Sequence, residues 1–296
     1  MNDHCTVLCL RFARRLLPLG AAFAIAACSS GGLSSPTPAG FGGATGFRAQ
    51  GIAHNRSTVQ IGSGFLLPRG VAVDASGNVF VADGGNGAVK KVAPDGTITT
   101  IASGLKLPYG IAVDAKDNVY VGCALMRIAP VRYYPPKGPF VKVGSGFYLP
   151  QGVALDSAGD VYIADTGNNL AKKVAVNGKI IRIGGVLDAP AGIAVDAAHN
   201  VYVSNTLANT VEKVTPGGIV TKVGSGFNHP AGLAVDRAGN LYVADSSNNA
   251  IKEVLIGGKI VTLGSGLSGP DGVTLDSAGN IYVADTYHNA VKRFKP

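Results

Sequence analysis

The sequence has little of what long helices and coiled coils are made from. Tryptophan is absent, glutamate occurs twice, and charged residues make up 15% of the 296-residue chain. A helical bundle or coiled coil repeats Glu, Lys, Leu and Ala about every 3.5 residues, so this composition excludes both classes. Hydrophobic residues still make up 46%, which excludes a disordered chain. The 42 glycines and 16 prolines favour many short strands joined by turns.

The apolar run nearest the N-terminus, residues 16–27, is too short to cross a bilayer, which takes about 20 residues. It follows two arginines and ends in small residues, as an export signal does. Together with Cys28 it resembles the lipobox of bacterial lipoproteins. We therefore expect residues 1–27 to be a lipoprotein signal peptide and Cys28 to be lipidated. An ordinary signal peptide followed by an incidental cysteine is the alternative.

Residues 28–56 are rich in Ser, Gly and Pro, which predicts a flexible tether between a membrane and a folded body at residues 57–296. We expect an exported protein anchored to the cell envelope. Ser29 stands where an aspartate would favour retention in the inner membrane, so the periplasmic side of the outer membrane is the expected location.

Only four cysteines are present, at positions 5, 9, 28 and 123. If the first two leave with the signal and Cys28 carries lipid, Cys123 stands alone. An intrachain disulfide and a multi-cysteine zinc site are then both excluded. The formal net charge of +8 includes arginines of the signal, and with export it does not require a nucleic-acid partner.

Internal repetition dominates the rest of the chain. A word of the form Pro-x-Gly, then three apolar or small residues, then Asp occurs six times, at spacings of 40, 42, 40, 40 and 40 residues. Each unit continues through polar turns and further short apolar runs, which predicts a four-stranded antiparallel meander. The six words end at Asp74, Asp114, Asp156, Asp196, Asp236 and Asp276.

A four-stranded sheet cannot bury both faces alone, whereas six sheets arranged radially cover one another. The sixth repeat stops near Phe294 without its fourth strand, while residues 57–64 precede the first repeat and match residues 219–226. The expected fold is an all-β, six-bladed β-propeller in which the N-terminal strand completes the last blade.

The strand segments at residues 78–83, 160–165, 240–245 and 280–285 carry a family resemblance: each reads Asn or Asp, apolar, aromatic, apolar, Ala, Asp. They resemble NHL repeats, and the likeness covers residues 57–296. It implies a six-bladed propeller. It implies less about function, because propellers of this family serve as binding platforms, sensor domains and a few enzymes.

Residues shared by every blade are best explained by needs that every blade has. We interpret the aspartate ending each first strand as an acceptor for backbone N–H groups of the next turn. The second aspartate, as in Asp83, predicts loop capping. Paired charges on the third strand, as in Lys90 and Lys91, are interpreted as a solvated rim that discourages edge pairing.

The informative positions are those that differ between blades. The middle residue of Pro-x-Gly should face the mouth of the central channel, and Tyr287 and His288 of blade 6 should lie on the same side. We predict a crescent that holds a ligand through polar groups and tyrosine rings, and ordinary drift between repeats is the alternative. The predicted ligand-binding residues are Arg69, Tyr109, Gln151, Asp271, Tyr287 and His288.

Blade 2 departs from the repeat. Four residues are missing after Cys123, which predicts a notch beside Tyr109 and Gln151. Six residues are added between residues 130 and 146, and Tyr133 and Tyr134 lie there beside prolines. We interpret this insertion as an exposed contact loop.

Catalytic signals are weak. Zinc-dependent lyases that share this architecture place histidines in the middle of Pro-x-Gly, and none of the six positions here is histidine. The only glutamates, Glu212 and Glu253, fall on third strands. We therefore predict a non-catalytic binding or scaffold module, monomeric, without catalytic residues, cofactor or metal, whose partner is an envelope protein or a small ligand. The alternative is a periplasmic lyase or lactonase with an atypical metal site.

Overall fold

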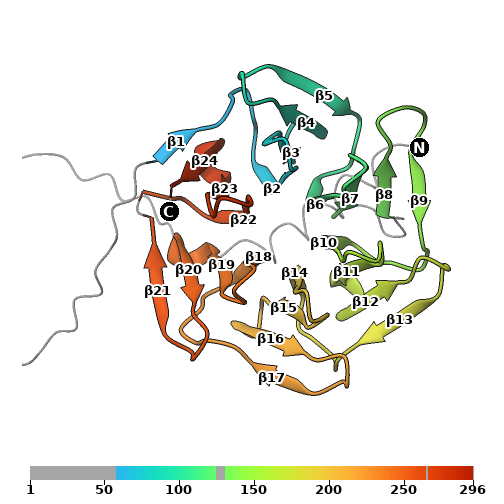
Figure 1. The fold of residues 1–296 in the computed structure, drawn as a ribbon, viewed down its shortest axis with the longest axis vertical. Coiled ribbons are helices and arrows are strands. Elements are labelled where there is room, and N and C mark those ends of the chain that lie inside the picture. The colour runs from blue at the N-terminus through green and yellow to red at the C-terminus, as the bar shows by residue number, and fades with distance from the viewer. Residues whose placement is uncertain (1–57, 125–130, 265, 296) are drawn as a thin grey trace, which may run out of the picture. The chain divides into compact units, whose positions relative to one another are not determined.

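The computed structural model describes residues 58–124, 131–264 and 266–295. They form six four-stranded antiparallel sheets placed around a common axis (Figure 1). Each repeat supplies one sheet, or blade, and the first strand of each blade lies nearest the axis. The six-bladed propeller expected from the repeats is confirmed.

The first three blades follow the chain in order. Blade 1 contains β2 (Pro68–Val73), β3 (Val79–Asp83), β4 (Ala88–Val92) and β5 (Ile98–Ala102). Blade 2 contains β6 (Pro108–Val113), β7 (Val119–Cys123), β8 (Val131–Tyr134) and β9 (Val141–Val143). Blade 3 contains β10 (Pro150–Leu155), β11 (Val161–Asp165), β12 (Leu170–Val174) and β13 (Ile180–Ile183).

The other three blades repeat the same pattern, and blade 6 takes its outer strand from the N-terminal side. Blade 4 contains β14 (Pro190–Val195), β15 (Val201–Asn205), β16 (Thr210–Val214) and β17 (Val220–Lys222). Blade 5 contains β18 (Pro230–Val235), β19 (Leu241–Asp245), β20 (Ala250–Val254) and β21 (Ile260–Leu263). Blade 6 contains β22 (Pro270–Leu275), β23 (Ile281–Asp285), β24 (Ala290–Phe294) and β1 (Thr58–Gln60).

The ring closes through β1. This strand runs antiparallel to β24, with Val59 opposite Arg293, and the two lie side by side in Figure 1. Ile61 continues the pairing by donating a backbone hydrogen bond to Val291, at 2.8 Å. The predicted closure by residues before the first repeat is confirmed.

The core lies between blades. Second strands are apolar on both faces, and their central residues Val81, Ile163 and Val243 are fully buried. Each such side chain stabilises the fold by about 1.5–3 kcal/mol relative to an exposed one. Because every sheet is covered on both faces by its neighbours, the repeated apolar strands are satisfied only in the closed ring.

The glycine of Pro-x-Gly is required by the close approach of neighbouring blades. A Cβ on Gly70 would lie 2.2 Å from the carbonyl oxygen of Tyr109, and one on Gly192 would lie 2.1 Å from that of Ala231. Corresponding distances around the ring do not exceed 2.5 Å. Any side chain here would push two first strands apart.

The aspartate that ends each first strand binds the turn that follows, as expected. In blade 1, Asp74 Oδ1 accepts hydrogen bonds from the backbone N–H groups of Ser76 and Asn78, at 2.9 and 2.8 Å. The Asn78 side chain donates to the second carboxylate oxygen. The bond from the backbone N–H four residues further on recurs in all six blades, so these six carboxylates shape the turns.

The loops divide into two faces. We call the side that carries the loops between first and second strands, and between third and fourth strands, the turn face. The opposite side, the loop face, carries the connections between blades and the loops between second and third strands. Three of these last loops contain 3-10 helices, η1 (Thr166–Asn168), η2 (Ser246–Asn248) and η3 (Thr286–His288). Within the described residues, no helix is long and apolar enough to span a membrane.

Candidate functional site

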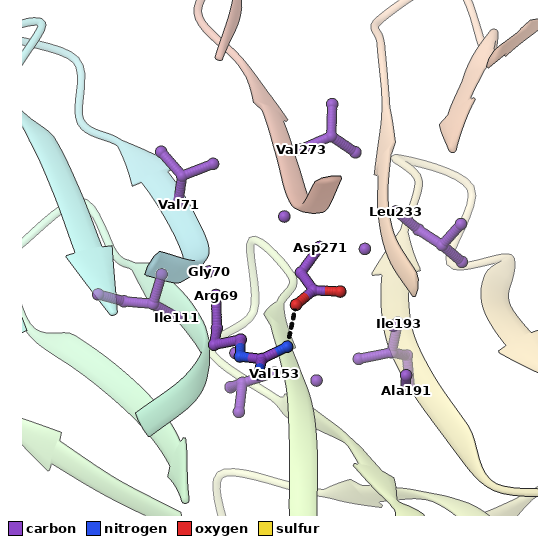
Figure 2. A pocket seen from close by; sticks show the side chains of 15 residues that line it. Arg69, Gly70, Val71, Ile111, Val153, Ala191, Ile193, Leu233, Asp271 and Val273 are labelled. Atoms are coloured by element: carbon purple, nitrogen blue, oxygen red, sulfur yellow. Dashed lines mark hydrogen bonds and ion pairs between the residues drawn. The ribbon is translucent and has the colours of Figure 1, made fainter. Parts of the chain in front are cut away.

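A small cavity of about 50 Å³ lies on the axis, at the loop-face ends of the first strands. Six of the fifteen residues that line it are the glycines of Pro-x-Gly, and its charged residues are Arg69 and Asp271 (Figure 2). The apolar residues labelled around this pair are Val71, Ile111, Val153, Ala191, Ile193, Leu233 and Val273, and all seven are buried.

Arg69 and Asp271 come from adjacent blades and form an ion pair across the mouth of the cavity. Figure 2 shows the two side chains pointing toward each other. The Arg69 side chain is 20% exposed and that of Asp271 is 8% exposed. Burial acts to lower the pKa of Arg69, but the Asp271 carboxylate outweighs it and raises the pKa above its usual value.

Tyr109 of blade 2 supports the arginine. The Arg69 guanidinium carbon lies 5.6 Å from the centre of the Tyr109 ring, within the range of a cation–π interaction. Burial, followed by the charge of Asp271, raises the pKa of the Tyr109 hydroxyl well above its ordinary value. This hydroxyl is therefore a neutral hydrogen-bonding group.

Tyr287 borders the same pair from blade 6. It is 52% exposed, and it lies near enough to influence the pKa values of Arg69 and Tyr109. A Cβ on Gly269 would lie 2.3 Å from its ring, so a glycine at this position leaves room for the tyrosine. We call Arg69, Tyr109, Asp271 and Tyr287 the mouth cluster.

The structure does not bring the other two predicted crescent residues into this cluster. Gln151 is half-buried and is not among the residues that act on Arg69, as Tyr109, Asp271 and Tyr287 are. His288 turns to the buried Asp285, with its Nδ1 at 2.8 Å from Oδ2. It occupies the place of Asn86, Asn168 and Asn248, which donate to the corresponding aspartates of their own blades.

The second aspartate caps a loop, as predicted. Asp83 Oδ1 accepts the backbone N–H of Leu66, at 2.7 Å, and Asp245 does the same for Asn228, at 2.6 Å. Both aspartates are fully buried. Their capping role is structural, which accounts for their recurrence without any chemistry.

The interpretation of the paired third-strand charges as a solvated rim is wrong for the first lysine of each pair. Lys90 Nζ lies 2.7 Å from Asp83, and Lys252 Nζ lies 2.6 Å from Asp245. Third strands are not edges, because a fourth strand covers each of them. The lysines therefore neutralise buried carboxylates. The pairs are Asp83–Lys90, Asp165–Lys172, Asp245–Lys252 and Asp285–Lys292.

Blade 4 exchanges both members of this pair. Asn205 replaces the aspartate and Glu212 replaces the lysine, and Asn205 Nδ2 donates to Glu212 Oε1 at 3.0 Å. Asn205 Oδ1 still accepts a loop N–H, from Asp188 at 2.6 Å. The constant seven-residue spacing and this joint exchange were the sequence signals that could have revealed the pairing.

Blade 2 lacks the pair, because Cys123 takes the place of the aspartate. The thiol is buried, and burial raises its pKa despite the nearby charge of Arg132. A buried thiol with a raised pKa is a poor nucleophile, consistent with a packing role. The four-residue deletion predicted after Cys123 is wrong, because Arg132 stands where blade 1 has Lys90, nine residues after Cys123 against seven after Asp83. The notch inferred from it, beside Tyr109 and Gln151, falls at residues 125–130, which lie outside the described residues.

The prediction that Tyr133 and Tyr134 of blade 2 lie in an exposed contact loop is wrong. Tyr133 and Tyr134 belong to β8 and are half-buried, packed against the cores on its two sides. Tyr133 lies 5.2 Å from Tyr120, measured between ring centres. The register places Arg132 where blade 1 has Lys90, so the residues added to this repeat precede β8 and follow Cys123. Beyond β8, Phe140 is 40% exposed, and the centre of its ring lies 4.5 Å from the Arg132 guanidinium carbon.

Three or more His, Cys, Asp or Glu side chains do not come together as a possible metal site anywhere in the described part of the chain. Glu253, one of the two glutamates, is buried and accepts the Tyr242 hydroxyl at 2.7 Å. Glu212 holds Asn205, as described above. Both glutamates therefore have structural partners within their own blades.

Comparison with solved structures finds the same fold at low sequence identity. A streptogramin B lyase aligns with a TM-score of 0.61 and 14% identity, over 81% of this chain and 97% of the lyase. A gluconolactonase from Xanthomonas campestris aligns with a TM-score of 0.69 and 17% identity, over 80% and 89%. A Bacteroides thetaiotaomicron protein of unknown function aligns with a TM-score of 0.68 and 19% identity, over 80% and 75%. No curated protein matches the sequence.

The NHL repeat family matches four segments, residues 65–92, 147–170, 227–253 and 267–294. These segments fall in blades 1, 3, 5 and 6, which are the blades that carry the buried aspartate–lysine pair. Blades 2 and 4, where that pair is lost or exchanged, fall outside the match. The chain is therefore a six-bladed β-propeller that carries NHL repeats in four of its blades.

Proposed function

We propose that this propeller is a non-catalytic binding module of the cell envelope. Its loop face, centred on the mouth cluster, recognises a protein or a small ligand. The observation that supports this proposal is the ion pair between Arg69 and Asp271, which occupies the middle of the channel mouth. Each charge is already balanced by the other, an arrangement that suits recognition better than proton transfer.

The mouth cluster defines the chemistry of the ligand. Arg69 Nε is buried and has no hydrogen-bond partner within the described residues. Tyr287 presents a half-exposed ring beside it. A partner that brings a hydrogen-bond acceptor to the guanidinium and a flat or apolar group to the ring fits both features.

The cavity itself is too small to hold a ligand. Its volume of about 50 Å³ is far below the roughly 300–1,000 Å³ of ordinary small-molecule sites. The ligand of this proposal therefore lies on the loop face and caps the channel, with Arg69 and Tyr109 beneath it. A protein surface or the end of a polymer fits such a site.

Capture from an envelope extract tests the binding proposal. The full chain with Cys28→Ser, immobilised and cross-linked, should retain a partner that the further double change Arg69→Ala and Tyr109→Ala loses. The matched control is His288→Asn, which restores the residue usual at that position and should keep the partner. Equal retention by the double variant would reject the mouth cluster as the site.

The enzyme alternative has its own test. The comparisons include a lyase and a lactonase, so the purified chain is assayed for turnover of a streptogramin B and of gluconolactone, with and without added divalent cations. A binding module should show no turnover and no stoichiometric metal. Turnover that depends on a bound metal would replace this proposal with the periplasmic enzyme.

Export and lipid attachment are part of the proposal and rest on the sequence around Cys28 alone. The full chain should sediment with cell membranes even in high salt, whereas the chain with Cys28→Ser should be extracted from them by high salt. A chain that stays in the cytoplasm, with residues 1–27 intact, would place the binding face in another compartment.

A further inference from the structure

Three apolar side chains protrude from the turn face of blades 3, 4 and 5. Val176 is 73% exposed, Ile219 is 65% exposed and Ile256 is 72% exposed. They lie in the turns between β12 and β13, β16 and β17, and β20 and β21. Since these turns occupy equivalent places in consecutive blades, the three side chains lie on one face, in one arc.

The turns share one hydrogen-bonding pattern, in which Val176 and Ile256 are the second residues and are presented alike, while Ile219 is the fifth residue, aligned with Lys179 and Lys259. In each turn the first residue donates a backbone hydrogen bond to the fifth, at 2.8–3.0 Å, as Leu255 does to Lys259. Side chains from the turn between the first and second strands bind two of the tips. Asp160 accepts the backbone N–H of Val176 at 3.0 Å, and the Asn240 side chain accepts that of Ile256 at 3.1 Å. The exposed apolar groups are thus held in place by the fold.

Cations surround these tips, and the neighbouring carboxylates are already engaged. Lys179, Arg237 and Lys259 are exposed on this side of blades 3 and 5. The carboxylates of the same three blades' turns, Asp156, Asp160, Asp196 and Asp236, all bond to turn groups or to Lys173. Blade 1 differs, because its corresponding turn carries the exposed Asp95.

Further apolar groups extend the arc toward the outer strands. Ile180 and Ile181 of β13 are 39% and 38% exposed, and Val220 of β17 is 44% exposed. Arg182 and Lys222, on the same strands, are also exposed. Blades 3 to 5 therefore present apolar tips and free cations together, where a soluble surface would mix both signs of charge.

We propose that the turn face of blades 3 to 5 docks on the surface of an anionic phospholipid membrane. Val176, Ile219 and Ile256 enter the interface between headgroups and acyl chains, and the lysines and arginines contact the headgroups. Each tip stands on a separate turn in a separate blade, which suits insertion into a fluid surface better than fitting into one protein pocket. Docking in this way leaves the loop face and the mouth cluster pointing away from the membrane.

The absence of tryptophan makes a direct test possible. Ile256→Trp and Val176→Trp, each in the full chain with Cys28→Ser, place the only tryptophan at a tip. The emission of both should shift to the blue, and should be quenched by lipid-borne quenchers, on vesicles that contain phosphatidylglycerol. Val186→Trp is the matched control, because Val186 is also 73% exposed but lies on the loop face. Its emission should not change.

Charge and apolar changes give the second readout, in vesicle sedimentation. Lys179→Glu with Lys259→Glu should weaken binding by at least about tenfold, since each cation near an anionic surface contributes about 1 kcal/mol. Lys106→Glu, on the loop face, is its control. Val176→Asp with Ile256→Asp should abolish binding, while Val186→Asp should not.

Three outcomes would overturn the proposal. They are equal binding to vesicles of phosphatidylcholine alone, a blue shift of the Val186→Trp control, and a tip that responds to a protein of the extract but not to vesicles. Arg69→Ala with Tyr109→Ala should bind vesicles as the parent chain does. Failure of the mouth-cluster proposal is therefore distinguishable from failure of this one.

Discussion

At the scale of single residues, the second aspartate of blades 1, 3, 5 and 6 is a buried carboxylate that needs a partner. Asp245 is fully buried, and a buried carboxylate is costly unless it is paired and hydrogen-bonded. Lys252, Asn248 and a loop N–H supply those partners. Blade 4 reaches the same result with Asn205 and Glu212, which shows that the requirement is a matched pair and not an aspartate as such.

Removing one member of the Asp245–Lys252 pair should therefore lower the free energy of unfolding more than exchanging both members does. Lys252→Met leaves Asp245 buried without its cation, and should lower the free energy of unfolding by about 3 kcal/mol. Asp245→Asn combined with Lys252→Glu copies blade 4 and should recover most of that loss. Urea unfolding of the two variants and the parent measures both effects. A double variant less stable than Lys252→Met would contradict the matched-pair explanation.

Adding a single methyl group at a glycine of Pro-x-Gly should also destabilise the fold. Gly192→Ala would place a methyl group 2.1 Å from the Ala231 carbonyl oxygen, and so force two blades apart. The expected loss is about 3 kcal/mol or more. Gly185→Ala is the control, because a Cβ there meets nothing within 4 Å. Equal thermal stability of the two variants would show that the first strands can yield.

Residue roles could be predicted from the sequence where the partner is the local backbone. The turn and capping aspartates were predicted correctly because short-range hydrogen bonding by Asp is a property of the residue itself. The partner of Lys90 does not follow from treating the third strand as an edge, because a fourth strand covers it. Pairing across strands depends on which side chains share a face, and the seven-residue spacing indicates it only together with the joint exchange to Asn205 and Glu212 in blade 4.

At the scale of elements, the short strand β1 closes the ring. Three residues of β1 pair with β24, and Ile61 adds one further hydrogen bond. Deleting residues 56–64 should lower the melting temperature by roughly 10 °C or more, because about 3 kcal/mol of pairing is lost in a domain of this size. Deleting residues 40–48 removes the same length and should leave the melting temperature unchanged. An unchanged melt in the first variant would contradict closure by β1.

The turns between first and second strands predict the response to acid. Partial burial acts to raise the pKa of Asp114, Asp196 and Asp276, but hydrogen bonds from the turns outweigh it and lower all three. Their folded pKa values thus lie below the unfolded value of about 3.9. The stability that they contribute is present above that pH and is lost as the pH falls through the folded values.

Unfolding measured between pH 7 and pH 2.5 checks this prediction. The free energy of unfolding should begin to fall below about pH 4. A triple variant with asparagine at all three positions should be less stable at pH 7 and show a shallower acid slope. The same slope in parent and variant would assign acid sensitivity to other groups.

The sequence predicted the strands and blades better than it predicted the contacts of single side chains. Six copies of one word predicted strand order, blade number and closure, because repeated blades must satisfy the same packing six times. Blade 2 was predicted less well. Its tyrosines look like loop residues beside prolines, but they lie on β8 and pack against neighbouring blades, which only the register shows.

At the scale of the whole molecule, the two faces of the ring differ in chemistry. The loop face carries a neutralised ion pair with tyrosines around the channel mouth. The turn face of blades 3 to 5 carries apolar tips and free cations. A membrane on one face and a partner on the other would give the propeller the geometry of an adaptor.

The candidate site could be predicted only in outline. The ring position of the middle residue of Pro-x-Gly placed Arg69 and Asp271 at the channel mouth, since the fold repeats. Their mutual pairing, and the turning of His288 to Asp285, depend on side-chain direction between blades. No repeat pattern contains that information.

Photo-cross-linking in intact cells tests the binding face most directly. A benzophenone amino acid in place of Tyr287 lies beside Arg69 and half exposed. Ultraviolet light should join it to one discrete partner, Arg69→Ala in the same chain should remove that adduct, and His288→Asn should leave it. An adduct that survives Arg69→Ala undiminished would show that the mouth cluster is not what this propeller uses to bind.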